Sequence, residues 1–136
     1  MKQKKRYVLF LVSLIAMLFC IGLAAAEQEL LSVEEAHELV SQNSGNKNFI
    51  IIDLRTRDDY DQGHIGGAIS MNYYATNFQR MASQLDRDAL IFMYCQRGKQ
   101  SPMALRDFKK MGFTQVRILD GGIAGWVAAG LPLAQP

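Results

Sequence analysis

Cysteine is scarce in this sequence. The chain has 136 residues and two cysteines, of which Cys20 lies in an apolar amino-terminal segment. The rest of the chain contains Cys95 alone, so it can form no internal disulfide bond. Its two histidines are far apart and no C-x-x-C pair is present, which argues against a structural zinc site. A single thiol in such a chain raises the question of chemical reactivity.

Basic residues are also few once the amino terminus is set aside. The chain has 15 Lys and Arg against 13 Asp and Glu, and four of the basic residues lie within residues 1–26. Residues 27–136 therefore carry 11 basic and 13 acidic side chains, a net charge near −2. They contain no basic stripe with interleaved aromatic residues, and we predict no nucleic-acid partner.

The amino-terminal segment has the order of a secretory signal peptide. A basic start over residues 2–6 precedes an uncharged run from Tyr7 to Leu23, and three alanines follow. We predict a signal peptide over residues 1–26, cleaved after Ala26, and one exported, periplasmic domain over residues 27–136. An uncleaved anchor is the alternative, because 17 uncharged residues are close to the shortest length that spans a membrane. In that case the leader would be the protein's membrane contact.

Short apolar runs alternate with helical patterns along residues 27–136. The apolar runs predict strands that are buried on both faces, as in a parallel sheet. Capping residues and apolar spacing predict the helices. We therefore predict a three-layer α/β domain, with a mostly parallel central sheet flanked by helices. The predicted strands are 49–52, 68–71, 90–94 and 116–119. Of the four predicted helices, the first follows a capping box at Ser32–Glu35, the second spans 75–85, the third runs from an N-cap at Ser101 to Gly112, and the fourth spans 123–129.

Cys95 directly follows the predicted strand 90–94 and precedes the predicted helix start at Ser101. Ligands of parallel α/β sheets bind at the carboxyl ends of strands, and a helix start offers free N–H groups to an anion. We therefore expect a thiol with a lowered pKa, in a loop that Gly98 allows to turn. An inert buried cysteine is the alternative. The glycine, the helix start and the cations Arg97 and Lys99 favour a nucleophile that meets an anionic substrate.

Three separated segments resemble the motifs of the rhodanese (sulfurtransferase) family, in its small, exported phage-shock-protein-E type. The resemblance extends from about Leu31 to Pro132, and it implies the rhodanese-like version of the α/β fold. The three segments are Ile52-Asp53-Leu54-Arg55 with Asp59-Tyr60 and Gly63-His64-Ile65-Gly66-Gly67-Ala68; Cys95-Gln96-Arg97-Gly98-Lys99-Gln100-Ser101; and Leu119-Asp120-Gly121-Gly122 with Trp126 and Gly130-Leu131-Pro132.

The resemblance implies a relay of sulfur through Cys95. The thiolate takes the sulfane sulfur of thiosulfate as a persulfide, and cyanide or a thiol then accepts it. The resemblance further implies backbone N–H groups that cradle the anion, a monomer, and no cofactor or metal. The residues expected to bind the substrate are Gln96, Arg97, Gly98, Lys99, Gln100 and Ser101.

Two other functions compete with sulfur transfer. One is a low-turnover persulfide carrier or binding module for a periplasmic partner. The other is a phosphatase or arsenate reductase with a similar loop. The phosphatase relatives of the family place an arginine that grips phosphate at the position of Ser101, and the serine there favours sulfur chemistry.

Polar and aromatic residues outside the loop have competing explanations. His64 could act as a general base, but structural hydrogen bonding is the expected role. We expect Asp53 and Arg55 to pair and to hold a turn rather than to react. Tyr73 and Tyr74 follow the second predicted strand, from where they could flank the pocket.

Overall fold

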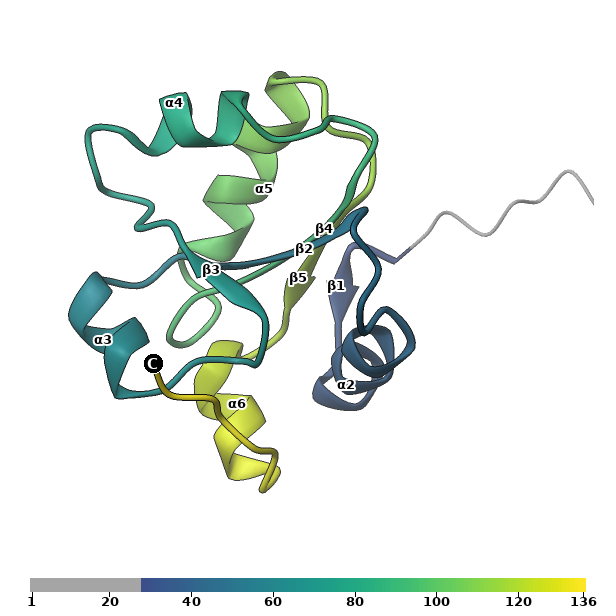
Figure 1. Cartoon of the computed structure of the whole chain (residues 1–136), viewed down its shortest axis with the longest axis vertical. Helices are drawn as coiled ribbons and strands as arrows, with labels where there is room; N and C mark the ends of the chain where they lie inside the picture. The colour runs from purple at the N-terminus through teal and green to yellow at the C-terminus, as the bar shows by residue number, and fades with distance from the viewer. Residues whose placement is uncertain (1–27) are drawn as a thin grey trace, which may run out of the picture.

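A parallel five-stranded sheet forms the centre of the domain (Figure 1). The computed structural model describes residues 28–136. Within them the strand order is β1-β5-β4-β2-β3, and all the pairs are parallel. All four predicted strands are present, and the two-residue β1 was not predicted. The strands are β1 (Leu30–Leu31), β2 (Phe49–Asp53), β3 (Ala68–Ser70), β4 (Leu90–Tyr94) and β5 (Val116–Leu119).

Helices cover both faces of this sheet. In Figure 1, α4 and α5 lie on one face, whereas α2, α3 and α6 lie on the other. The three-layer α/β architecture predicted from the sequence is therefore confirmed. The helices are α2 (Val33–Gln42), α3 (Arg57–Gln62), α4 (Phe78–Ser83), α5 (Ser101–Lys110) and α6 (Gly122–Ala128).

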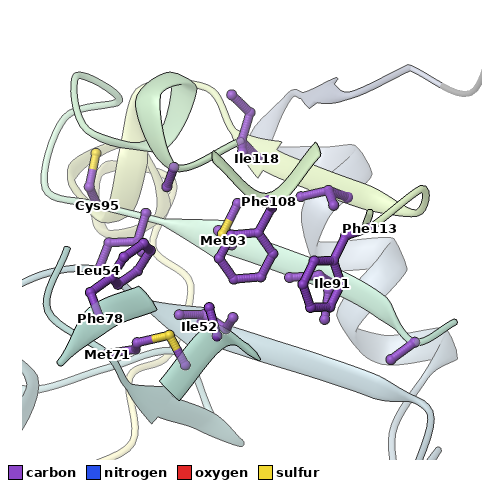
Figure 2. Close-up of a cluster of buried hydrophobic side chains, with 14 residues drawn as sticks. Ile52, Leu54, Met71, Phe78, Ile91, Met93, Cys95, Phe108, Phe113 and Ile118 are labelled. Carbon is purple, nitrogen blue, oxygen red and sulfur yellow. The ribbon is translucent and has the colours of Figure 1, made fainter. Parts of the chain in front are cut away.

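Alternating side chains of each strand supply two separate cores. In β4, Ile91 and Met93 join the cluster formed with α4 and α5, which Figure 2 shows with Cys95 at one end. Phe92 and Tyr94 point the other way and pack with α2 and α6. Because both faces are covered, every position of β4 is apolar, which explains the uninterrupted hydrophobic run in the sequence.

The helix boundaries confirm some of the predicted caps and correct others. The capping box of α2 is present: Ser32 Oγ accepts a hydrogen bond from the N–H of Glu35, and Ser32 N–H donates to the Glu35 carboxylate. α4 begins at Phe78 rather than at residue 75, because residues 75–77 form turns. The predicted N-cap at Ser101 is wrong, since Gln100 is the N-cap and Ser101 is the first helical residue.

α3 was not predicted because it has no apolar periodicity. None of its six residues is buried. Its start is fixed by polar contacts: Thr56 Oγ1 accepts from Asp59 N–H at 3.2 Å and donates to the Asp59 carboxylate at 2.6 Å. The Thr56-x-x-Asp59 spacing is a capping pattern from which this helix could have been predicted.

Among residues 28–136, no helix has the length and apolarity needed to cross a membrane. The predicted signal peptide, with its cleavage after Ala26, lies outside the described residues.

Candidate active site

The candidate site begins where β4 ends. Tyr94 is the last residue of the strand, and Cys95 opens the short connection to α5. Gly98 has a φ of +79°, a left-handed conformation that lets the connection fold back over the cysteine. Cys95 is 1% exposed, so the polar groups around the thiol largely determine its properties. The sulfur therefore sits at the carboxyl edge of the sheet, as predicted.

Ser101 contributes a hydroxyl to the sulfur instead of capping the helix. Its side chain is fully buried, and its Oγ–H donates a hydrogen bond to Cys95 Sγ at 3.2 Å. The backbone N–H of Gln100 also donates to Sγ, at 3.4 Å. The first turn of α5 thus directs two donors at one sulfur atom.

These contacts favour the thiolate form of Cys95. Burial raises the pKa of the thiol. Hydrogen bonds from the Ser101 hydroxyl and from the backbone N–H groups of Ser101, Gln100 and Gly98 outweigh burial and leave the pKa below its ordinary value. The predicted lowering of the pKa is confirmed. Residues 96–100 were predicted to form a cradle of backbone N–H groups, and of these five residues Gly98 and Gln100 donate to the sulfur. A thiolate is the reactive form of cysteine.

The start of α6 holds the loop from behind. The N–H of Ile123 donates to the carbonyl of Cys95 at 2.9 Å, and the N–H of Ala124 donates to the carbonyl of Gln96 at 3.1 Å. This contact needs glycine at position 122, where φ is +61° and a Cβ would lie 2.5 Å from the Cys95 carbonyl oxygen. The position of the loop therefore depends on close approach between two segments of backbone.

The pair of Asp53 and Arg55 is structural, as predicted. Arg55 makes a buried ion pair with Asp53 at 2.7 Å and donates to the carbonyl of Gly63 at 2.7 Å. Its third contact, with Gln96 Oε1 at 3.4 Å, reaches the loop. The guanidinium thus ties the end of β2 to the residue that follows the cysteine.

His64 is also in a structural position. Its ring stacks on Tyr60 with 3.8 Å between centroids, and Nδ1 lies 3.0 Å from the Tyr60 carbonyl. Its backbone pairs with that of Ala134 near the end of the chain. These contacts match the hydrogen-bonding role expected from the sequence.

A hollow of about 300 Å³ opens in front of Cys95. Arg97 and Lys99 are both exposed at its rim, beside Tyr74, whose side chain is 68% exposed. Tyr73 does not line this hollow. Of the loop residues predicted to bind the substrate, Gly98, Gln100 and Ser101 direct hydrogen bonds at the sulfur, and Gln96, Arg97, Lys99 and Gln100 line the hollow.

Comparison with known proteins identifies this arrangement. The profile of the rhodanese-like domain matches residues 35–129. The chain belongs to the rhodanese-like family. One relative is protein YibN of Escherichia coli strain K12, which is 31% identical over 108 residues that cover 74% of this chain and 68% of YibN. Another is thiosulfate sulfurtransferase 16 of Arabidopsis thaliana, which is 31% identical over 111 residues that cover 74% of this chain and 88% of the relative.

Solved structures agree with this assignment. The crystal structure of the Alr3790 protein from Anabaena superposes on this rhodanese-like domain with a TM-score of 0.65 and 30% identity. The superposition covers 78% of this chain and 82% of the other. The matched profile, residues 35–129, contains β2, β3, β4, β5 and the Cys95 loop, and the fold prediction made from the three motifs is confirmed.

Two features of the site escaped sequence reasoning. The hydroxyl of Ser101 was predicted to cap α5 or to meet the substrate, and its bond to the sulfur became visible only in three dimensions. In the sequence, Gly122 is recognised as part of the third rhodanese-like segment, whereas in the structure it provides the contact with the Cys95 carbonyl. A pair of glycines just beyond a strand is the one sequence signal for such a contact, and this signal does not identify the segment that the glycines approach.

Replacing Ser101 with alanine tests the hydroxyl. Because the variant loses a donor to the sulfur, the pKa of Cys95 should rise, and alkylation by iodoacetamide at neutral pH should slow several-fold. The pH profile of the alkylation rate should shift to higher pH, since a larger fraction of the thiol stays protonated. Ser101→Thr keeps the hydroxyl and serves as the control. An unshifted profile in Ser101→Ala would contradict the role of this bond.

Proposed function

We propose that this rhodanese-like protein is a thiosulfate sulfurtransferase that works through a persulfide on Cys95. The observation that carries the proposal is the buried Cys95 sulfur, with two hydrogen-bond donors behind it and two exposed cations around the hollow in front. Thiosulfate is a small dianion, and the cations would attract it to the hollow. The proposed activity also agrees with the names of several relatives, among them the Arabidopsis thaliana protein.

The first half-reaction follows from this arrangement. The Cys95 thiolate attacks the outer sulfur of thiosulfate, a new S–S bond forms at Sγ, and the old S–S bond breaks. Sulfite leaves with the electron pair of the broken bond. The persulfide anion that remains on Cys95 lies within reach of loop N–H groups that can stabilise its charge.

The second half-reaction returns the free enzyme. A nucleophile, either cyanide or a thiolate, attacks the outer sulfur of the persulfide and forms a bond to it. The bond between the two sulfurs of the persulfide breaks, and Cys95 leaves as a thiolate. The donors from Gln100 and Ser101 that lower the pKa of the thiol also make it a better leaving group.

Phosphatase chemistry fits this site less well. A phosphatase loop of this type needs an arginine at position 101 to hold the phosphate oxygens. Here the position is occupied by a buried serine, whose hydroxyl is directed at the sulfur. A hydrogen bond to sulfur suits an enzyme that forms and releases a persulfide.

Replacing Arg97 or Lys99 with alanine tests their contact with the donor. Each substitution should raise the KM for thiosulfate by about three- to tenfold, with little change in kcat, because each removes one exposed charge from the hollow. The measurement is initial rates with cyanide as acceptor. Lys47→Ala is the matched control, since Lys47 is an exposed cation that precedes β2 at the opposite edge of the sheet. An unchanged KM in both variants would remove these residues from the substrate site.

We further propose that residues 1–26 are a signal peptide and that the domain works in the periplasm. The basic start, the uncharged run and the three alanines support this proposal. Amino-terminal sequencing of the protein recovered from the periplasm should begin at Glu27, and recovery of uncut protein in the membrane fraction would favour the anchor.

A further inference from the structure

A second groove lies beside the Cys95 hollow. Its volume is about 450 Å³, and it runs between α5 and the segment that joins β3 to α4. Tyr74 lines both the hollow and the groove, so the two spaces meet at this side chain. The groove is lined by Tyr73, Tyr74, Ala75, Thr76, Phe78, Gln79, Met103 and Asp107.

The aromatic wall of this groove is well anchored. Tyr74 meets Tyr73 edge to face, with centroids 5.2 Å apart, and Tyr73 meets the buried Phe78 in the same way at 5.0 Å. The hydroxyl of Tyr73 donates to Asp107 Oδ2 at 3.0 Å, which ties the wall to α5. An exposed tyrosine held in this manner offers a ligand a preorganised apolar surface.

The groove leads directly away from the sulfur. α5 begins at Ser101, whose hydroxyl contacts Cys95 Sγ. Met103 and Asp107 are four residues apart and share one face of the helix, and Asp107 lies about 9 Å beyond Ser101 along the axis. A molecule that lies in the groove with one end at the persulfide would therefore extend for several carbon atoms along α5.

The two spaces differ in charge. Arg97 and Lys99 line the Cys95 hollow, which suits an anionic donor. Asp107 is the one charged residue among those that line the groove, and the nearby Lys110 is an exposed side chain with its Nζ 3.9 Å from Asp107 Oδ1. Arg106 is also exposed on α5 and acts electrostatically on the neighbouring Tyr73, so two cations offset the charge of the Asp107 carboxylate. The groove therefore has no excess of positive charge comparable to that of the hollow, and it should accept a carbon stem beside its aromatic wall without favouring an anion.

We propose that this groove is the subsite for the sulfur acceptor, and that the acceptor is an organic thiol with an extended carbon stem and a neutral end. The inference rests on the proposed sulfurtransferase function. The stem packs along Met103 against Tyr74, and its end reaches Asp107. The acceptor thiolate attacks the outer sulfur of the Cys95 persulfide; the new S–S bond forms on the acceptor, the old one breaks, and Cys95 leaves as a thiolate.

The test compares acceptors that differ in the stem and in the charge at its end. With saturating thiosulfate, the wild-type protein should show a KM for 6-mercapto-1-hexanol about tenfold below the value for 3-mercapto-1-propanol, because the longer stem buries more carbon. Met103→Gln should raise the KM for 6-mercapto-1-hexanol by about fivefold. Asp107→Asn should lower the KM for 6-mercaptohexanoate by a similar factor.

The controls separate this inference from the proposed function. Cyanide has no stem, so its reaction with thiosulfate should be unchanged in Met103→Gln and Asp107→Asn. Met111→Gln makes the same substitution just after α5, outside the groove, and should leave every KM unchanged. Equal KM values for 6-mercapto-1-hexanol and 3-mercapto-1-propanol in the wild-type protein would assign the groove to another occupant and overturn the inference. Absence of the thiosulfate–cyanide reaction in the wild-type protein would overturn the proposed function itself.

Discussion

Cys95→Ser is expected to lower the rate of the thiosulfate–cyanide reaction by about 10³-fold or more. The substitution removes the atom that would carry the transferred sulfur, and a serine hydroxyl is too weak a nucleophile to replace a thiolate of lowered pKa. No other cysteine lies within residues 28–136. The measurement is the steady-state rate of thiocyanate formation.

The fold of this variant provides the control. Cys95 is buried at the margin of the core beside α5, and serine occupies nearly the same volume. Its thermal unfolding should therefore stay close to that of the wild-type protein, so that a lost activity reports on chemistry. Retained activity in a well-folded Cys95→Ser protein would contradict the proposed mechanism.

The wild-type rate also separates an enzyme from a persulfide carrier. Rapid multiple turnover with thiosulfate and a small acceptor supports the enzyme. A single loading step followed by slow release, which accelerates only with a specific protein partner, would support the carrier. Both functions need Cys95, and they differ in whether free small molecules complete the cycle.

Gly122→Ala is expected to destabilise the domain by about 2–5 kcal/mol and to inactivate it. Alanine at a φ of +61° costs about 1–2 kcal/mol, and its Cβ would lie 2.5 Å from the carbonyl oxygen of Cys95 and 2.7 Å from that of Gln96. The backbone must shift to relieve this contact, at a further cost of about 1–3 kcal/mol. Chemical denaturation followed by circular dichroism measures the loss of stability.

The chain provides a matched control for the clash. Gly130 has a φ of +74°, yet a Cβ there would have no atom within 4 Å. Gly130→Ala should therefore cost only the conformational part, about 1–2 kcal/mol, and should leave the activity intact. If the two variants lost stability equally, the close contact between α6 and the loop would not be what makes glycine necessary at position 122.

The sequence was sufficient to predict the sheet and the position of the nucleophile. β2 and β4 are covered on both faces, so nearly all of their residues are apolar and the runs are easy to recognise. The carboxyl end of β4 then places Cys95 at the edge where parallel sheets bind ligands. The direction of its pKa shift followed from the adjacent helix start, and the structure agrees.

Other features depend on contacts between segments far apart in the chain. β1 has two residues, too few to form a periodic pattern, and it is defined by its pairing with β5. The hydroxyl of Ser101 is six residues from Cys95, and a helix start allows it either to cap or to turn toward the sulfur. The groove along α5 needs Tyr74 and Asp107 to meet across the fold, and neither the spacing nor the residue types predict that meeting.

The most direct test of the proposed function is the mass of the protein after incubation with thiosulfate. Intact-protein mass spectrometry should show one added sulfur, and peptide mapping should place it on Cys95. Cyanide should then remove the added sulfur and restore the original mass. Turnover of thiosulfate without any added sulfur on Cys95, or an added sulfur that persists in Cys95→Ser, would contradict the persulfide mechanism.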